Sequence, residues 1–114
     1  MSAVKVDQAL LKQLQALSNA NRLQIMAWIL QPREHFEAQI DGDLVDDGVC
    51  VGRIVDKVGL SQPTVTAHMK VLADAGLVTS KKIKNWVFYK PVRSELQRFR
   101  SLINSLPIDH PVED

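Results

Sequence analysis

The strongest fold signal in this chain is a glycine between two short helical segments. Residues 51–58 have the apolar spacing of a short helix, and Gly59 stands where helices commonly end in the left-handed conformation. Ser61 then offers a side-chain cap, and Pro63 lies in the first turn of the next helix, where its missing N–H does no harm. The sequence therefore predicts two helices, about 51–58 and 62–75, joined by a sharp turn.

A β-hairpin is expected after the second helix. Residues 77–83 and 86–90 are rich in the β-branched and aromatic types that favour strands, and the pair Lys84-Asn85 lies between them as a turn. Helix, turn, helix and hairpin is the order of a winged helix-turn-helix domain. The hairpin would be its wing, and the helix over 62–75 its recognition helix.

The remaining segments complete a mainly α fold with a small β-hairpin wing and five main helices. Apolar residues recur at helical spacing over residues 7–17 and 92–106. Another segment, capped by Ser18-Asn19 and ended by Gln31-Pro32, is apolar on nearly every side. A helix of that kind favours a central place in the core.

Residues 33–48 are acidic and irregular, with turn-like sequences at Asp41-Gly42-Asp43 and Asp46-Asp47-Gly48. Residues 49–51 are expected to close this stretch as a short extended segment.

The charge pattern changes after residue 52. Residues 1–52 carry four Lys or Arg against seven Asp or Glu, whereas residues 53–100 carry ten against three. A basic middle favours a surface that binds a polyanion, and an ordinary solvated surface is the alternative.

The size and cysteine content indicate a single cytoplasmic domain over residues 1–114. A chain of this length buries roughly two-thirds of its unfolded surface, which is enough for a real core. The longest apolar run is the six residues from Ile25 to Leu30, far short of a membrane span, and the N-terminus has no apolar signal region. A single cysteine, Cys50, excludes an intrachain disulfide and fits a reducing compartment.

The expected partner is double-stranded DNA. Gln62, Thr66 and Ala67 are assigned to base edges, because small and polar side chains suit the major groove. Lysines of the hairpin and the Ser61 cap are assigned to phosphates. The complete set of candidate DNA-binding residues is Ser61, Gln62, Thr64, Thr66, Ala67, His68, Lys70, Lys81, Lys82 and Lys84. A side chain wedged between two helices is the alternative interpretation for His68.

Three stretches resemble the ArsR-type (arsenic-repressor-like) bacterial regulators. Residues 17–26, LSNANRLQIM, are similar to the family's L-x-x-x-x-R-L-x-I-L signature. Residues 59–78, GLSQPTVTAHMKVLADAGLV, are very close to its recognition helix, and residues 86–89, WVFY, match the second wing strand. The resemblance covers about residues 7–106. It implies a homodimeric winged-helix repressor that a ligand releases from its operator.

The chain departs from this family at its metal sites. Many metal-sensing members carry Cys-x-Cys before the recognition helix, where this chain has Cys50, Val51 and Gly52, and Val55 also stands where a thiolate would be expected. The last helix lacks the Asp and His pairs of the other common site. We therefore expect no metal and no cofactor. A packed structural thiol is favoured for Cys50, and a redox or ligand-sensing thiol remains an alternative.

The terminal helices are expected to form the dimer interface, because their apolar stripes exceed what a small core needs. The candidate interface residues are Leu10, Leu14, Leu96, Phe99, Leu102, Ile103 and Leu106. An enzyme is not expected, since no catalytic motif is present. A small-molecule effector stays open, as do two alternative functions. They are a winged-helix protein–protein assembly module without specific DNA binding, and a repressor that responds to redox or metal through Cys50.

Overall fold

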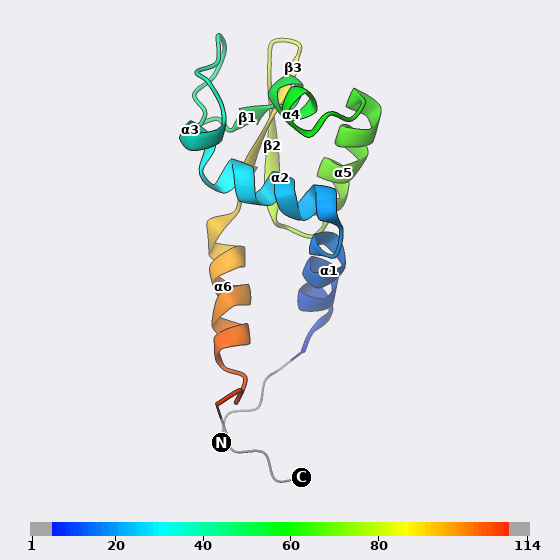
Figure 1. The fold of residues 1–114 in the computed structure, drawn as a ribbon, viewed down its shortest axis with the longest axis vertical. Coiled ribbons are helices and arrows are strands. Elements are labelled where there is room, and N and C mark those ends of the chain that lie inside the picture. The colour runs from blue at the N-terminus through cyan, green and yellow to red at the C-terminus, as the bar shows by residue number, and fades with distance from the viewer. Residues whose placement is uncertain (1–5, 110–114) are drawn as a thin grey trace.

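The computed structural model describes residues 6–109, which contain six helices and three strands (Figure 1). They follow one another as α1 (Gln8–Leu17), α2 (Ala20–Leu30), α3 (Pro32–His35), β1 (Val49–Cys50), α4 (Val51–Val58), α5 (Gln62–Asp74), β2 (Val78–Ile83), β3 (Trp86–Pro91) and α6 (Arg93–Asn104). Within this range no helix has the length and apolar character that crossing a membrane requires. The ends of the domain expected over 1–114 lie outside the described residues.

Side-chain caps set where the first two helices begin. Asp7 Oδ1 accepts a hydrogen bond from the Leu10 N–H at 2.8 Å, and Asn19 Oδ1 accepts one from the Arg22 N–H at 3.1 Å. Each cap satisfies a donor that the first helical turn leaves without an intrahelical partner. The predicted starts of both helices are confirmed.

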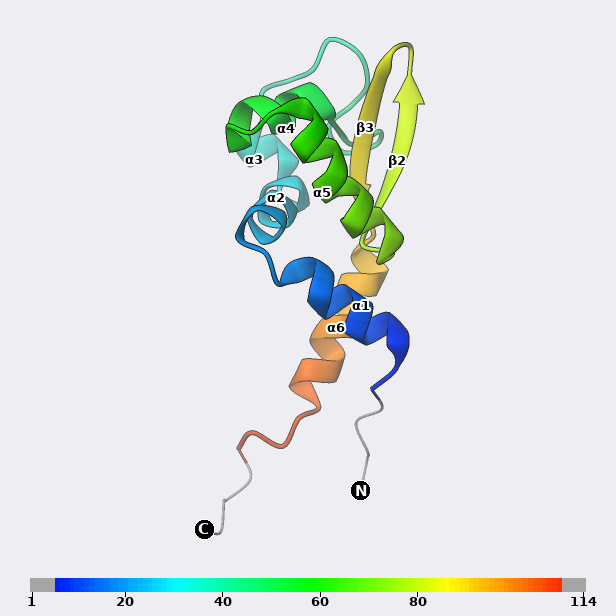
Figure 2. The same cartoon turned by 90° about the vertical axis from the view of Figure 1, so that its right-hand side faces the viewer.

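Gly59 makes the turn between α4 and α5. Its φ of 74° and ψ of 26° are left-handed, a conformation that a residue with a Cβ adopts only at a cost. Ser61 then caps α5, as the sequence predicts. Figure 2 shows the result, with α4 and α5 packed together and the hairpin standing beside α5.

The three strands form one antiparallel sheet in the order β1-β3-β2. Because side chains alternate across a strand, Phe88 and Tyr89 point to opposite faces of the sheet. Tyr89 belongs to the hydrophobic core, whereas Phe88 lies under Gly42, at which a Cβ would come within 3.0 Å of the phenyl ring. Residues 37–48, here called the acidic loop, pass over the Phe88 face of the sheet at Gly42, and their Leu44 joins the core.

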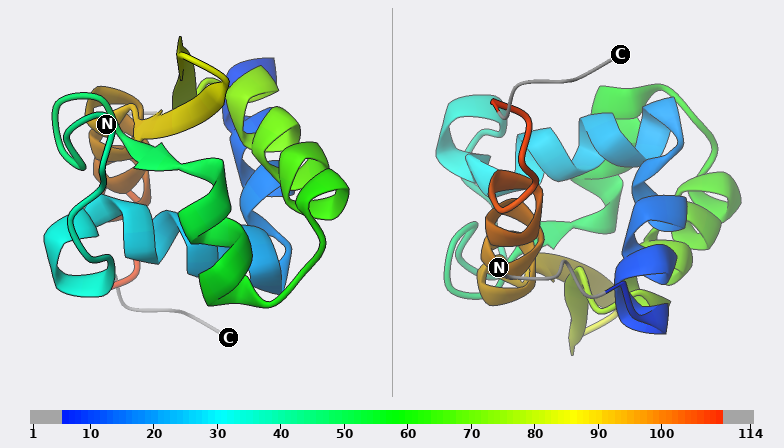
Figure 3. Two further views of the ribbon diagram at one scale, coloured as in Figure 1. Left: turned by 90° about the horizontal axis from the view of Figure 1, so that it is seen from above. Right: turned by 90° about the horizontal axis from the view of Figure 1, so that it is seen from below.

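The core lies between the sheet and helices α2, α4 and α5, which form the compact part of the molecule when it is seen end-on (Figure 3). Its fully buried side chains from α2 and α5 are Ile25, Met26, Ile29, Val65, Met69 and Leu72. The helical spacing of Val65, Met69 and Leu72 predicts the inward face of α5, and the burial of all three confirms it. α2 takes the central place in the core that the sequence predicts, although only one of its faces meets the core and Leu23 is 54% exposed.

Two short elements add to the expected fold. Pro32 follows the end of α2 as predicted, but it also begins the four-residue α3, since proline suits the first turn of a helix. Val49 and Cys50 form a third strand, so the wing is part of a sheet rather than a lone hairpin. The predicted turn Lys84-Asn85 does join β2 to β3, and Lys84 takes a φ of 55° there.

Helices α1 and α6 extend together from one end of the body (Figures 1 and 2). Gln13 Nε2 donates to Glu95 Oε1 at 3.2 Å, and Arg98 Nη1 lies 3.7 Å from Asp7 Oδ2. No residue of α6 is buried in this single chain. An entire helix thus keeps its apolar side chains at least partly in solvent.

Candidate nucleic-acid interface

The outer face of α5 combines short side chains with polar ones. Gln62, Thr66 and Ala67 are exposed and, with Pro63 and Lys70, line a shallow hollow on the helix. Short side chains let a helix approach the floor of the DNA major groove, and a glutamine amide matches the donor and acceptor on the adenine edge. The structure thus brings together the residues that the sequence assigned to base reading.

The first turn of α5 uses most of its own donors. Ser61 Oγ lies 2.9 Å from Thr64 Oγ1 and accepts the Thr64 N–H at 3.4 Å. Pro63 has no N–H, and the Val65 N–H donates to the Ser61 carbonyl at 3.0 Å. The Gln62 N–H is the donor of this turn without an acceptor in the described chain. An incoming phosphate would therefore meet one free backbone N–H at the start of α5.

Lys70 lies at the edge of this face and is paired within α5. Its Nζ lies 3.0 Å from Asp74 Oδ2, one helical turn further along. Both side chains are more than half exposed, so the pair is weak and a phosphate can take the place of the carboxylate. Lys70 therefore stays among the candidate DNA contacts.

His68 points toward a neighbouring helix. Its Nδ1 lies 3.1 Å from Arg22 Nη1 of α2, and Arg22 Nε donates to the Ala16 carbonyl at 2.6 Å. Because a guanidinium only donates, Nδ1 accepts this hydrogen bond and the ring proton sits on Nε2. Burial, followed by the Arg22 charge, lowers the pKa of His68 from its ordinary 6.5. This contact favours the interpretation of His68 as a side chain wedged between helices.

Of the four lysines in the wing, two are held by carboxylates of the acidic loop, and Lys90 Nζ donates to the Asp46 carbonyl at 3.2 Å. Lys81 Nζ lies 2.6 Å from Asp47 Oδ1, and Lys84 Nζ lies 3.0 Å from Asp41 Oδ1. Lys82 is exposed on the face of β2 opposite Lys81, and it has no ion pair among residues 6–109. The structure leaves Lys82 open to a phosphate, whereas Lys81 and Lys84 would have to exchange a carboxylate for one.

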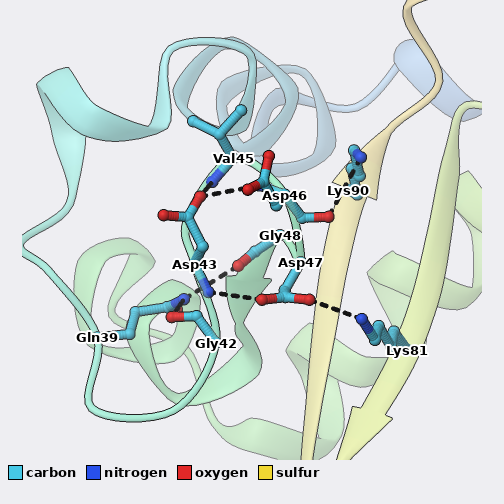
Figure 4. Close-up of polar contacts among 9 residues, drawn as sticks. All are labelled: Gln39, Gly42, Asp43, Val45, Asp46, Asp47, Gly48, Lys81 and Lys90. Atoms are coloured by element: carbon cyan, nitrogen blue, oxygen red, sulfur yellow. Dashed lines mark hydrogen bonds and ion pairs between the residues drawn. The ribbon is translucent and has the colours of Figure 1, made fainter.

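Internal hydrogen bonds give the acidic loop a defined shape (Figure 4). Asp43 Oδ1 accepts the N–H groups of Val45 and Asp46, and the Asp43 N–H donates to Asp47 Oδ2 at 2.7 Å. The N–H groups of Asp46 and Val45 lower the pKa of Asp43. The hydrogen bond from Lys81, followed by the Asp43 N–H, lowers the pKa of Asp47. Both carboxylates are thus held in the charged form, and Asp47 contacts the wing through Lys81.

Gln39 fastens the acidic loop to β1. Its Nε2 donates to the Gly48 carbonyl at 3.0 Å, and its Oε1 accepts the Cys50 N–H at 2.6 Å. The side chain of Cys50, a free thiol, is half-buried next to this contact. Within residues 6–109, no three His, Cys, Asp or Glu side chains come together as a metal site would need.

The predicted dimer residues differ in how far the single chain exposes them. Leu14, Ile103 and Leu106 are between 37% and 40% exposed, and the half-buried members are Leu96, Phe99 and Leu102. Leu10 is only 3% exposed, so in the single chain it has almost no free surface to offer a partner. With Gln13 and Ala16 it recurs every three residues on the face of α1 that is buried in its own chain.

Sequence reasoning missed three residues that shape this surface. Arg22 was seen as part of a signature but not as the partner of His68, and Asp41 and Asp47 were seen only as turn residues. An acidic segment and a basic hairpin in one small domain were the available signal. Opposite charge alone does not determine which carboxylate meets which lysine, so the individual pairs could be identified only from the folded structure.

A model of a known protein family matches the segment that contains the helix-turn-helix. The family model described as "Bacterial regulatory protein, arsR family" matches residues 46–80. The uncharacterized HTH-type transcriptional regulator YbzH of Bacillus subtilis (strain 168) is 39% identical over 75 residues, which are 66% of this chain and 75% of that protein. Sequence similarity therefore extends well beyond the recognition helix.

Two solved structures share the architecture. HlyU from Vibrio cholerae N16961 is 26% identical, with a TM-score of 0.60 over 86% of this chain and 90% of its own. The homodimeric winged helix-turn-helix DNA-binding domain Mb0332 from Mycobacterium bovis has a TM-score of 0.61, with 96% of this chain and 93% of that chain covered. At 21% identity this second likeness concerns the fold alone. The predicted winged helix-turn-helix fold is confirmed.

Proposed function

Because this chain belongs to the arsR family of bacterial regulatory proteins, we propose that it represses transcription as a homodimer bound to an inverted-repeat operator. Its family makes it a DNA-binding transcriptional regulator and not an enzyme. One observation above all supports repression at an operator. The exposed polar face of α5 lies beside a wing on which Lys82 has no partner among the described residues. A helix of this kind reads bases while a wing fixes its position on the backbone.

Base reading falls to Gln62, Thr66 and Ala67 in this proposal. They share the exposed face of α5 and have no hydrogen bonds within residues 6–109 that would hold their side chains elsewhere. Lys82 and Lys70 contact phosphates, and neither contact carries sequence information. Lys81 and Lys84 join them only when phosphate replaces the loop carboxylates.

The homodimer uses the exposed stripes of α1 and α6. No residue of α6 is buried in the single chain, and Leu14, Ile103 and Leu106 stay partly in solvent. The homodimeric state of Mb0332, which shares this fold, supports the same assembly here. A two-fold dimer places two recognition helices in successive major grooves, so half-site centres lie roughly 34–36 Å apart or at a multiple of that distance.

The signal that releases the DNA is not a metal at the thiolate site in this proposal. Cys50 supplies one thiolate per chain, whereas a closed structural zinc site needs about four ligands. DNA release is measured by fluorescence anisotropy with zinc, arsenite, cadmium and peroxide, in wild type and in Cys50→Ser. Release that depends on a metal and on Cys50 would contradict the proposal.

Footprinting on the DNA upstream of the chain's own gene tests the repressor function directly. We expect a protected inverted repeat, because regulators of this family commonly control their own operon. Affinity for this site is then measured against salt concentration. Each neutralised phosphate should lower log K by about 0.9 per log unit of salt.

A winged-helix module for protein–protein assembly is the competing function. Such a module would give no footprint on any duplex, and its wing lysines would serve only solubility. Binding that is specific but independent of salt would also contradict the repressor, because phosphate contacts release counterions. The footprint and the salt slope together separate the two functions.

A further inference from the structure

A cavity of about 290 Å³ opens between the acidic loop, the first two turns of α4 and the start of β3. Its position is away from the exposed face of α5, so the proposed base-reading residues do not line it. Ligand cavities in proteins begin near this size. The space is sufficient for a single-ring organic molecule.

Two large apolar side chains border the cavity and remain in solvent. Trp86 is 47% exposed, and Ile40 on the acidic loop is 97% exposed. An aromatic ring placed between them would be covered by the indole of Trp86, and the apolar surface of both side chains would leave water. Trp86 and Ile40 therefore favour a ligand with a flat, apolar ring.

Two opposite charges lie on the α4 side of the cavity, three residues apart on one helix. Arg53 Nη2 donates to the Ala38 carbonyl at 3.2 Å, and the other guanidinium donors have no partner within residues 6–109. Asp56 is exposed and likewise forms no ion pair in the described chain. A guanidinium suits a carboxylate, and a carboxylate suits an N–H or O–H donor.

Gly52 leaves the floor of the cavity open. A Cβ at this position would lie 4.0 Å from both Cys50 Sγ and Trp86 Cζ3, which is ordinary contact. Alanine would therefore fit without strain, while the longer side chain of leucine would extend from the helix into the space beside Trp86. This position offers a way to fill the cavity without touching the charged residues.

We propose that this cavity binds a small aromatic carboxylic acid that also carries an amine or hydroxyl group. The ring lies against Trp86, the carboxylate pairs with Arg53, and the amine or hydroxyl donates to Asp56. This inference rests on the proposed function only for its consequence. Asp41 borders the same cavity and holds Lys84 at 3.0 Å, so a bound ligand that steadies the acidic loop keeps Lys84 away from phosphate and weakens DNA binding.

Binding is tested on the full chain without DNA, with 2-aminobenzoate as the probe. The two indole N–H signals of ¹⁵N-labelled protein come from Trp28 and Trp86, and Trp86→Phe assigns them. We expect a saturable shift of the Trp86 signal, while Trp28, which lies beyond the cavity lining, serves as the internal control. No shift of Trp86, or equal shifts of both signals, overturns the site.

Ligand chemistry and two variants test the class of ligand. Aniline lacks the carboxylate, and cyclohexanecarboxylate lacks both the aromatic ring and the amine. Both should bind at least about tenfold more weakly, as the loss of a charged hydrogen bond or a stacked ring predicts. Arg53→Gln should weaken the binding of 2-aminobenzoate by a similar factor. Gly52→Leu should abolish this binding, whereas Gly52→Ala should retain it. Affinity unchanged by both Arg53→Gln and Gly52→Leu overturns the site, whatever the DNA result.

The effect on DNA is measured separately, at saturating 2-aminobenzoate. We expect at least about fivefold weaker operator binding, the lower end of typical coupling between two sites. Lys84→Ala should remove most of this effect without changing ligand affinity. Ligand binding with unchanged DNA affinity overturns the regulatory consequence. A chain that binds ligand but no duplex would refute the proposed repressor and leave the site standing.

Discussion

Asp47 Oδ1 lies 2.6 Å from Lys81 Nζ, which places a carboxylate of the acidic loop on a lysine of the wing. Asp41 and Lys84 repeat the arrangement at 3.0 Å nearer the tip of the hairpin. Both lysines are largely exposed, so neither pair is worth much free energy of folding. The two ion pairs instead lower the positive charge that the wing offers to DNA, because the loop neutralises two lysines that a DNA backbone would otherwise meet.

Asp47→Asn should make DNA binding tighter at low salt and more dependent on salt. The amide leaves Lys81 free to neutralise one further phosphate in each chain, which adds about 0.9 per chain to the salt slope. Glu37→Gln is the matched control, since it removes the same charge from the same loop but has no contact with the wing among the described residues. Equal effects of the two substitutions in an anisotropy titration would contradict a specific role for Asp47.

Lys82→Ala should weaken binding to all sequences alike and flatten the salt slope. Unlike Lys81, Lys84 and Lys90, Lys82 has no hydrogen-bond or ion-pair partner in residues 6–109, so its phosphate contact needs no exchange. The loss in slope is about 0.9 per chain. Lys81→Ala should change the slope less than Lys82→Ala while Asp47 is present. A larger effect of Lys81→Ala would show that the loop carboxylate does not compete with DNA.

Gln62→Ala should relax sequence preference rather than affinity in general. Gln62 is exposed at the start of α5, and a lost base contact costs roughly 1–3 kcal/mol at one or two operator positions. Binding to a library of operator variants measures which positions lose discrimination. A uniform loss across the library, together with a flatter salt slope, would mean that Gln62 contacts the backbone and that helix and wing roles are reversed.

The helix-turn-helix could be predicted because its signals are local. Gly59 has a left-handed φ of 74° and Ser61 accepts the Thr64 N–H, and both roles follow from residue type and spacing. The wing turn at Lys84-Asn85 was equally local. Val65 and Met69 were predicted to point inward from helical spacing alone, and both are fully buried.

The acidic loop could not be predicted because its contacts are distant in sequence. Asp41 and Lys84 are 43 residues apart, and Asp47 and Lys81 are 34 apart. A loop without periodicity gives no pattern from which to place it on one face of a sheet. The burial of Leu10 within its own chain could not be predicted for another reason. Leu10 and Leu14 are one turn apart, and only the packing of α1 decides which of them is covered.

Ile103→Glu should produce monomers that bind DNA poorly. Ile103 is 37% exposed in the single chain, and in the proposed dimer its side chain is covered, where a charge without a partner is costly. Leu23→Glu is the control, because Leu23 is an exposed apolar residue on α2, outside the proposed interface. Sedimentation of Ile103→Glu as a full dimer in analytical ultracentrifugation would count against this interface.

The free energy of unfolding should depend on His68 below neutral pH. The folded state lowers the pKa of His68 from 6.5, mainly by burial and then by the Arg22 charge, so the unfolded chain takes up a proton first as the pH falls. The contribution of neutral His68 is therefore full above about pH 6.5, declines below it, and stops changing once the pH passes the lowered folded pKa. Protonation would also remove the Nδ1 acceptor that Arg22 uses at 3.1 Å.

His68→Gln has no titrating ring, so urea titrations between about pH 5 and 7.5 should show wild type losing more stability than this variant. Parallel curves for the two proteins would mean that the Arg22–His68 contact does not hold the ring neutral.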